Sequence, residues 1–140
     1  MKNRLLIFLL CTIALCSCNT TKKMVESNHL ALVGTEWQLE SIEGQYYTSS
    51  KEQVKPYIVF DTASQYHGNF GCNDFFGSYY LKKKKLQLTY AGATKKLCSE
   101  MTIERAMMKA IKADISTYTI RGNNLILYSG KKEILRFSKK

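Results

Sequence analysis

Hydrophobic and polar residues alternate with period two along several short stretches of the chain, and this alternation predicts β-strands. In residues 35–43, Trp37 and Leu39 alternate with glutamate and glutamine, and Gly44 ends the stretch. Residues 45–55 are mostly polar and predict a loop. The other stretches with strand character are residues 57–61, 78–82, 86–89, 118–120, 125–128 and 134–137.

A different period marks one segment, residues 100–113, as an α-helix. Its apolar residues recur at helical spacing and share one face, and they are Ile103, Ala106, Met107, Ala110 and Ile111. Glu104 near the start and Lys109 near the end are placed to interact favourably with the helix dipole. We expect Ser99 or Thr102 to be the N-cap.

The order of these elements indicates the fold class. Short strands without an alternation of strand and helix point to an antiparallel sheet. Turns at residues 122–124 and 130–132 separate the last three strands and predict a meander. The predicted fold is mainly β (α+β): a small antiparallel, barrel-like sheet of about seven to eight strands with one packed helix. We expect side chains to fill its interior.

The most unusual composition lies in residues 67–81. This stretch holds three of the chain's eight glycines and three of its six phenylalanines, together with Cys72. Glycines among aromatics suggest a backbone that turns tightly while large rings are buried. We therefore expect a turn here with the aromatic side chains directed inward. Asn73 and Asp74 are expected to make turn hydrogen bonds to the backbone.

The first residues have the features of a bacterial lipoprotein leader. A positive start precedes an apolar run, residues 5–15, that is shorter than the about 20 residues needed to span a bilayer. The run ends in Leu-Cys-Ser-Cys, in which a small residue precedes Cys18 but a bulky leucine precedes Cys16. We predict that residues 1–17 are a signal peptide and that Cys18 is lipidated. An ordinary cleaved signal peptide with incidental cysteines is the alternative.

The predicted lipidation of Cys18 also implies where the protein is located and how the chain is divided into a tether and a domain. Residues 18–32 are polar and aperiodic and form the lipidated N-terminus and a flexible tether, whereas residues 33–140 form the domain. No aspartate follows Cys18, and this absence favours an outer-membrane anchor that faces the periplasm. Acyl chains such as palmitate on one residue anchor a protein stably when two or more are present.

The charge of the chain favours anionic partners. The formal net charge is +10, and removal of Lys2 and Arg4 with the leader leaves 19 − 11 = +8. The densest run of positive charge consists of Lys82, Lys83, Lys84 and Lys85. One interpretation is a finger that binds anions such as lipid headgroups, and the other is a solvated hairpin tip between two strands. Export argues against a nucleic-acid partner.

Five blocks in order resemble the META domain, the family of the bacterial heat-shock protein HslJ. They are Gly34-Thr35-Glu36-Trp37-Gln38-Leu39, then Gly71-Cys72-Asn73 with Phe76-Gly77-Ser78-Tyr79, then Thr94-Lys95-Lys96-Leu97-Cys98, then a helix bearing Glu104, then residues 118–127. The resemblance covers residues 32–140. It implies a compact antiparallel barrel-like fold with a helix and an association with stress response. It brings no catalytic residue, cofactor or ligand.

The cysteines outside the leader suggest a disulfide. Once Cys18 carries lipid, Cys72 and Cys98 remain as an even pair, and in an oxidising periplasm such a pair is most simply a disulfide. Two reduced, buried cysteines are the alternative. A thiol-dependent hydrolase would instead use Cys72 or Cys98 with His67 as base. A zinc site at His67, Cys72 and Asp74 matches no known ligand spacing.

We therefore predict a non-enzymatic, membrane-anchored envelope lipoprotein with a binding or stress-related role. Its expected partners are the membrane, through the lipid anchor, and an envelope protein or anionic lipid. We expect a monomer without metal or cofactor. The alternatives are the hydrolase built on Cys72, Cys98 and His67, and a barrel that binds a small apolar ligand.

Overall fold

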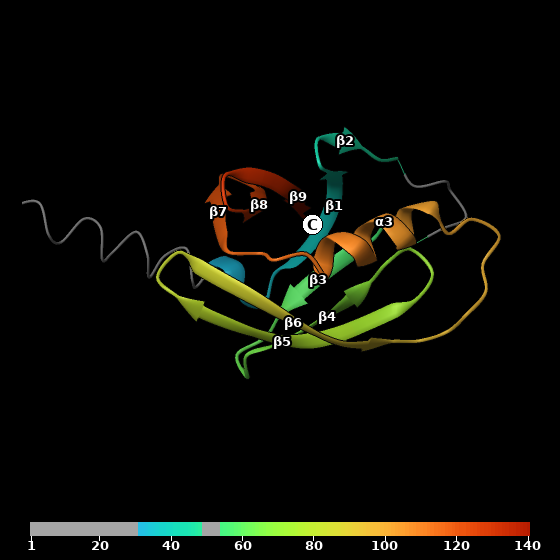
Figure 1. The fold of residues 1–140 in the computed structure, drawn as a ribbon, viewed down its shortest axis with the longest axis horizontal. Helices are drawn as coiled ribbons and strands as arrows, with labels where there is room; N and C mark the ends of the chain where they lie inside the picture. The colour runs from blue at the N-terminus through green and yellow to red at the C-terminus, as the bar shows by residue number, and fades with distance from the viewer. Residues whose placement is uncertain (1–30, 49–53) are drawn as a thin grey trace, which may run out of the picture.

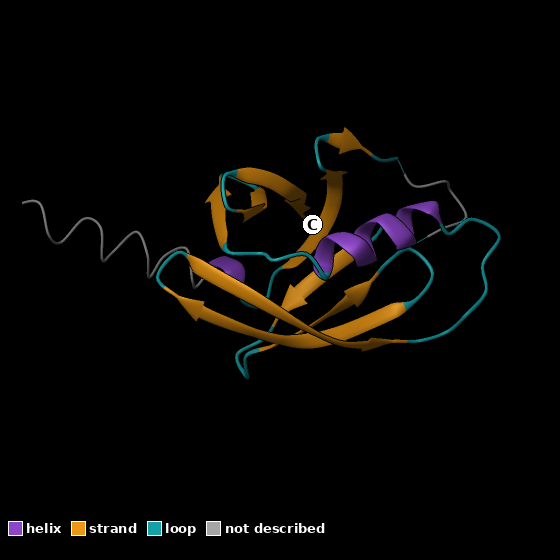
Figure 2. Ribbon diagram, viewed as in Figure 1, coloured by secondary structure: helices purple, strands orange, loops and turns teal. Residues whose placement is uncertain are grey.

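A computed structural model describes residues 31–48 and 54–140. Figures 1 and 2 show strands that curve around the longer helix, so the predicted mainly β, antiparallel fold is confirmed. The described residues form nine strands rather than seven or eight. The elements are β1 (Glu36–Ile42), β2 (Gln45–Tyr46), β3 (Tyr57–Phe60), β4 (Gln65–Asn69), β5 (Asp74–Lys82), β6 (Lys85–Ala93), α3 (Thr102–Ile111), β7 (Thr117–Arg121), β8 (Asn124–Ser129) and β9 (Lys132–Lys139).

The sheet closes on itself into a barrel. Its strands follow one another in the order β2-β1-β3-β4-β5-β6-β7-β8-β9, and β1 also pairs with β9. Closure removes the exposed strand edges that an open sheet would have. The weakest junction is between β6 and β7, which share one pair, Lys85 with Thr117. The two-residue β2 only extends the hairpin from β1, and its polar sequence gave no strand signal.

The helix packs against the barrel through one side. Glu104, Met107, Ala110 and Ile111 are its buried residues, and α3 contacts β1 and β9. The helix is shorter than the predicted range 100–113, and Met101 precedes it without a side-chain cap. The prediction of a Ser99 or Thr102 cap was therefore wrong.

Aromatic and aliphatic side chains fill the interior of the barrel. Phe60 and Tyr79 meet edge to face with ring centroids 5.2 Å apart, and Phe70 stacks on Phe75 at 3.9 Å. Such ring pairs add to the stabilisation from burial alone. The largest fully buried side chains are Trp37, Tyr66, Phe60, Phe70, Phe75, Phe137, Leu32, Leu39, Ile58, Leu86, Met107 and Ile111. Because Leu32 is among them, the core reaches into the segment predicted as tether.

Residues 67–81 are mostly strand. They include the end of β4, a four-residue connection with Gly71 at φ +111°, and most of β5, which begins at Asp74 rather than at residue 78. In β5 the side chains alternate, so Phe75 and Tyr79 are buried. Phe76 and Tyr80 point outward and are each 56% exposed. The prediction that every aromatic of this stretch turns inward was therefore wrong for these two.

Two of the glycines in this region make room for rings rather than for turns. A Cβ atom on Gly77 would clash with the Thr89 carbonyl oxygen and lie 2.5 Å from the ring of Tyr66. One on Gly68 would clash with the Tyr57 carbonyl oxygen and lie 2.7 Å from the ring of Phe75. Both distances are well below van der Waals contact. The absence of a side chain at these positions therefore lets the barrel hold Tyr66 and Phe75 inside.

The N-terminal predictions lie outside the described residues. These are the signal peptide 1–17, lipidation at Cys18 and the tether up to residue 30. Within residues 31–48 and 54–140, no helix has the length and apolar character needed to cross a membrane.

Candidate functional site

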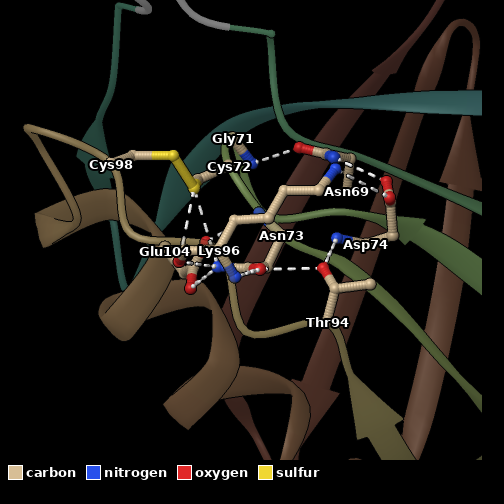
Figure 3. Close-up of a disulfide and its surroundings, with 9 residues drawn as sticks. All are labelled: Asn69, Gly71, Cys72, Asn73, Asp74, Thr94, Lys96, Cys98 and Glu104. Carbon is tan, nitrogen blue, oxygen red and sulfur yellow. Dashed lines mark hydrogen bonds and ion pairs between the residues drawn. A yellow bond between two sulfur atoms is a disulfide. The ribbon is translucent and has the colours of Figure 1, made fainter.

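A polar cluster joins three segments that are distant in sequence (Figure 3). The first is the β4–β5 connection with Gly71, Cys72 and Asn73, the second is the loop that follows β6, and the third is α3. The glycine at position 71 permits a positive φ, and this places the next two residues toward the helix. The Gly-Cys-Asn motif therefore lies at the junction of the sheet and the helix.

Asn73 is the centre of this cluster, and its side chain is fully hydrogen-bonded. Its Nδ2 group donates to the Lys96 carbonyl at 3.0 Å and to Glu104 Oε1 at 2.9 Å. Its Oδ1 atom accepts from the Lys96 backbone N–H at 2.7 Å and from the Thr94 hydroxyl at 2.8 Å. An amide offers two donor hydrogens and two acceptor lone pairs, and all four are used. The bonds are long-range contacts rather than the local turn bonds predicted from sequence.

Glu104 holds Asn73 from the helix side. Its carboxylate accepts from the Asn73 backbone N–H at 2.9 Å through Oε2, in addition to the side-chain bond through Oε1. Glu104 is only 4% exposed, so its carboxylate oxygens have lost their hydrogen bonds to water. The hydrogen bonds from Asn73 replace them. Burial and the negative charge of Glu104 together raise the pKa of Tyr90. The first-turn position predicted for Glu104 is correct, but its carboxylate is buried against the loop.

A disulfide between Cys72 and Cys98 lies beside Asn73. The two Cα atoms are 6.3 Å apart, within the usual range for a disulfide. The Lys96 carbonyl oxygen lies 3.9 Å from Cys72 Sγ. The covalent bond and the Asn73 hydrogen bonds therefore fix the same loop, residues 94–98, against the barrel.

Hydrogen bonds with Asn69 and Thr94 also fix the start of β5. The Asn69 amide donates to Asp74 Oδ1 at 2.7 Å, and Asn69 Oδ1 accepts from the Gly71 N–H at 2.6 Å. The Asp74 N–H donates to the Thr94 hydroxyl at 3.1 Å. Asp74 also faces the Lys96 ammonium at 3.6 Å, in an exposed pair that contributes little stability. The side chains of Asn69, Asp74 and Thr94 thus all form hydrogen bonds or ion pairs within the cluster.

His67 lies apart from the disulfide in the strand register. It is an exposed residue of β4, opposite Val59 and Phe76, whereas the neighbours of Cys72 are Asn73, Lys96 and Cys98. Neither sulfur of a disulfide is a thiolate nucleophile. Within the part of the chain that the structure describes, no three His, Cys, Asp or Glu side chains are placed to hold a metal ion.

The four lysines occupy a hairpin tip. Lys82 ends β5, Lys85 starts β6, and Lys83 adopts φ +57° in the two-residue turn between them. All four are exposed, as the solvated-tip interpretation requires. Anion binding at this tip stays a prediction.

Sequence reasoning missed the partnership of Glu104 with Asn73. A signal was present, because Glu104, Met107 and Ile111 are spaced i, i+3 and i+7 and therefore share the buried face of the helix. A glutamate on such a face requires a buried partner. The identity of that partner depends on the closed sheet and cannot be read from spacing.

Fold and cluster together define a small closed-barrel domain in which a disulfide and an Asn–Glu pair hold α3 and the loop before it against the sheet. The META domain family matches residues 30–140, and the chain belongs to this family. A search of curated proteins gives no match.

Solved structures share the fold. An NMR structure of a protein from Burkholderia xenovorans is 24% identical, with a TM-score of 0.62 and coverage of 81% of this chain and 87% of its own. A second NMR structure is 24% identical, with a TM-score of 0.58 and coverage of 78% and 92%. The crystal structure of a DUF4847 family protein from Bacteroides vulgatus is 13% identical, with a TM-score of 0.56 and coverage of 79% and 96%. At these identities the similarity concerns the fold alone.

Proposed function

We propose that the protein is an envelope lipoprotein, anchored through Cys18, whose META domain binds a partner and carries out no reaction. The observation that carries the proposal is the commitment of the polar cluster to structural bonds. Asn73 uses all its hydrogen-bonding capacity on Glu104, Lys96 and Thr94, and Cys72 is linked to Cys98. A catalytic group needs a free atom that can reach its substrate.

The sequence of the leader supports the membrane anchor. The apolar run at residues 5–15 and the small residue before Cys18 fit a lipoprotein leader, and the lack of an aspartate after Cys18 favours the outer membrane's periplasmic face. A tether between the lipid and the barrel would hold the domain close to the membrane surface. Family membership supports a stress-related role for the binding.

Cys18→Ala is expected to abolish the anchor, because the thiol that accepts the lipid is lost. Cells fed a clickable palmitate analogue should yield a labelled wild-type protein in the outer-membrane fraction. The Cys18→Ala protein should be unlabelled and should not sediment with the membrane. Cys16→Ala is the matched control and should behave as wild type. Persistent label on Cys18→Ala would contradict the assignment.

The lysine tip supplies a second membrane contact in this proposal. Each lysine near an anionic bilayer contributes about 1 kcal/mol, so Lys83→Glu with Lys84→Glu should weaken vesicle binding by more than about tenfold. The measurement is cosedimentation of the Cys18→Ala chain with vesicles that contain phosphatidylglycerol, so that the anchor does not dominate. Phosphatidylcholine vesicles are the control. Equal binding before and after charge reversal would refute a role for Lys82–Lys85.

A further inference from the structure

A groove of about 830 Å³ lies between α3, the β1–β2 hairpin and the start of β9. Its volume is within the range of small-molecule sites in proteins. The groove lies outside the filled interior of the barrel, and it is separate from the disulfide cluster, because neither Asn73 nor Cys72 lines it. In Figure 1, β2 and α3 lie on the same side of the molecule.

The floor of the groove is apolar. Ile42, Ala110 and Ile134 line it and are only 6%, 5% and 5% exposed. Tyr47 and Met108 continue this surface and pack partly against the core. Methionine adapts its shape readily to alkyl groups. Because the three floor residues are nearly buried, the half-buried Tyr47 and Met108 offer a ligand most of the hydrophobic contact.

The rim of the groove on the helix side is positive. Arg105 and Lys109 are four residues apart on one face of α3, and Lys112 follows directly after the helix as its C-cap. All three are exposed, and in the described ranges none forms a salt bridge. The Lys112 ammonium lies 4.4 Å from the ring centroid of Tyr90.

One carboxylate lines the groove, and its charge is balanced. Glu43 accepts a hydrogen bond from the Lys132 ammonium at 2.7 Å, and this bond lowers the pKa of Glu43. Lys109 adds a smaller electrostatic effect in the same direction. Glu43 therefore stays ionised and paired, and the cations of the helix keep the groove positive as a whole.

We infer that this groove binds a single-chain anionic amphiphile, a long-chain fatty acid, with its alkyl chain on the apolar floor and its carboxylate at Arg105 and Lys109. Arginine and lysine are the natural partners of a carboxylate, and the apolar floor accounts for the rest of such a ligand. The groove follows α3 from residue 105 to its end at residue 111, a length of about 9 Å, and part of an alkyl chain can lie along it. The inference rests on the proposed binding role and names the ligand class.

The test uses the full lipidated chain in phosphatidylcholine nanodiscs with a photoactivatable palmitate. Mass spectrometry of crosslinked peptides should place the label on the segments 42–47 and 105–113. Reversing two rim charges, with Arg105→Glu and Lys109→Glu, should lower this labelling by about tenfold or more, equivalent to about 1.4 kcal/mol. The matched control, Arg121→Glu with Lys139→Glu, reverses the same number of charges at exposed positions outside the groove and should leave the labelling within about twofold.

Two further probes separate the ligand sources. A fatty alcohol with the same photoactivatable chain should label the groove about tenfold less, because the carboxylate is missing. Phosphatidylglycerol that carries the chain should label it weakly, because a second chain has no place on the floor. Label spread evenly over the barrel, equal label after rim reversal, or stronger label from phosphatidylglycerol would overturn the inference. Such results would leave membrane anchoring, measured separately with Cys18→Ala, intact.

Discussion

Replacement of Cys72 and Cys98 together by serine is expected to lower the free energy of unfolding by about 3.5 kcal/mol. The disulfide spans a sequence separation of 26 residues, and its loss frees that loop in the unfolded chain. Cys98 is exposed and Cys72 half-buried, so serine adds little desolvation cost. Urea unfolding followed by Trp37 fluorescence is the measurement, because this single tryptophan is 1% exposed.

Reduction provides the internal control for this prediction. Dithiothreitol should shift the wild-type urea midpoint to that of the double variant and should leave the double variant unchanged. A double variant that unfolds at the wild-type midpoint would show that the link between Cys72 and Cys98 contributes no stability.

Glu104→Gln is expected to lower the free energy of unfolding by about 2–4 kcal/mol. The glutamate accepts two hydrogen bonds from Asn73, one through each oxygen. Glutamine supplies one acceptor oxygen and places an NH2 group where the other bond was, so one buried donor of Asn73 loses its partner. Urea midpoints of the two proteins give the difference.

Two comparisons distinguish this effect from a general loss of charge. Glu43→Gln removes an exposed carboxylate that is paired with Lys132 and should leave the midpoint nearly unchanged. Asn73→Ala combined with Glu104→Gln should cost clearly less than the sum of the single changes, because the two residues share their bonds. Strict additivity, or a Glu104→Gln midpoint equal to that of Glu43→Gln, would refute the pairing.

The sequence was sufficient for elements whose pattern is local. Trp37 and Leu39 alternate with polar residues, and β1 occupies Glu36–Ile42 with both side chains buried. The last three strands and their turns follow the predicted meander, with Gly122 and Gly130 at positive φ. Each of these patterns depends on neighbours within a few residues, so local composition determines it.

Prediction failed where tertiary packing decides the conformation. Strand β4, Gln65–Asn69, contains a glycine and several polar residues and therefore has little strand propensity. Pairing with β3 and β5 nevertheless holds it in a β-conformation. Gly68 and Gly77 suggested turns, but they face the rings of Phe75 and Tyr66 in strands. A glycine that makes space for a ring and a glycine that turns the chain cannot be distinguished by composition.

The candidate sites depend even more strongly on tertiary structure. Asn73 and Glu104 are 31 residues apart, and the groove combines Ile42 and Ile134 with the helix face of Arg105 and Lys109. The four consecutive lysines, in contrast, can be recognised in the sequence because they are adjacent. Of the helix cations, the sequence pattern assigns a role only to Lys109, as a partner of the helix dipole, and no sequence signal places an apolar strip beside Arg105 and Lys109.

These features divide the domain into a structural part and a surface part. The disulfide, Asn73 and Glu104 hold the loop 94–98 and α3 against the barrel. Because α3 is held in this way, its opposite face presents Arg105 and Lys109 beside the floor of the groove. Glu104→Gln should therefore also weaken palmitate labelling of the groove to the extent that it displaces the helix.

The central claim is that the cysteines and polar residues of the cluster hold the fold and do not react. Treatment of the folded, unreduced protein with iodoacetamide, followed by peptide mass spectrometry, tests it most directly. We predict no adduct on Cys72 or Cys98 until a reductant is added, after which both are modified. An adduct on either cysteine before reduction would reveal a free thiol beside Asn73 and would contradict the structural role of the cluster.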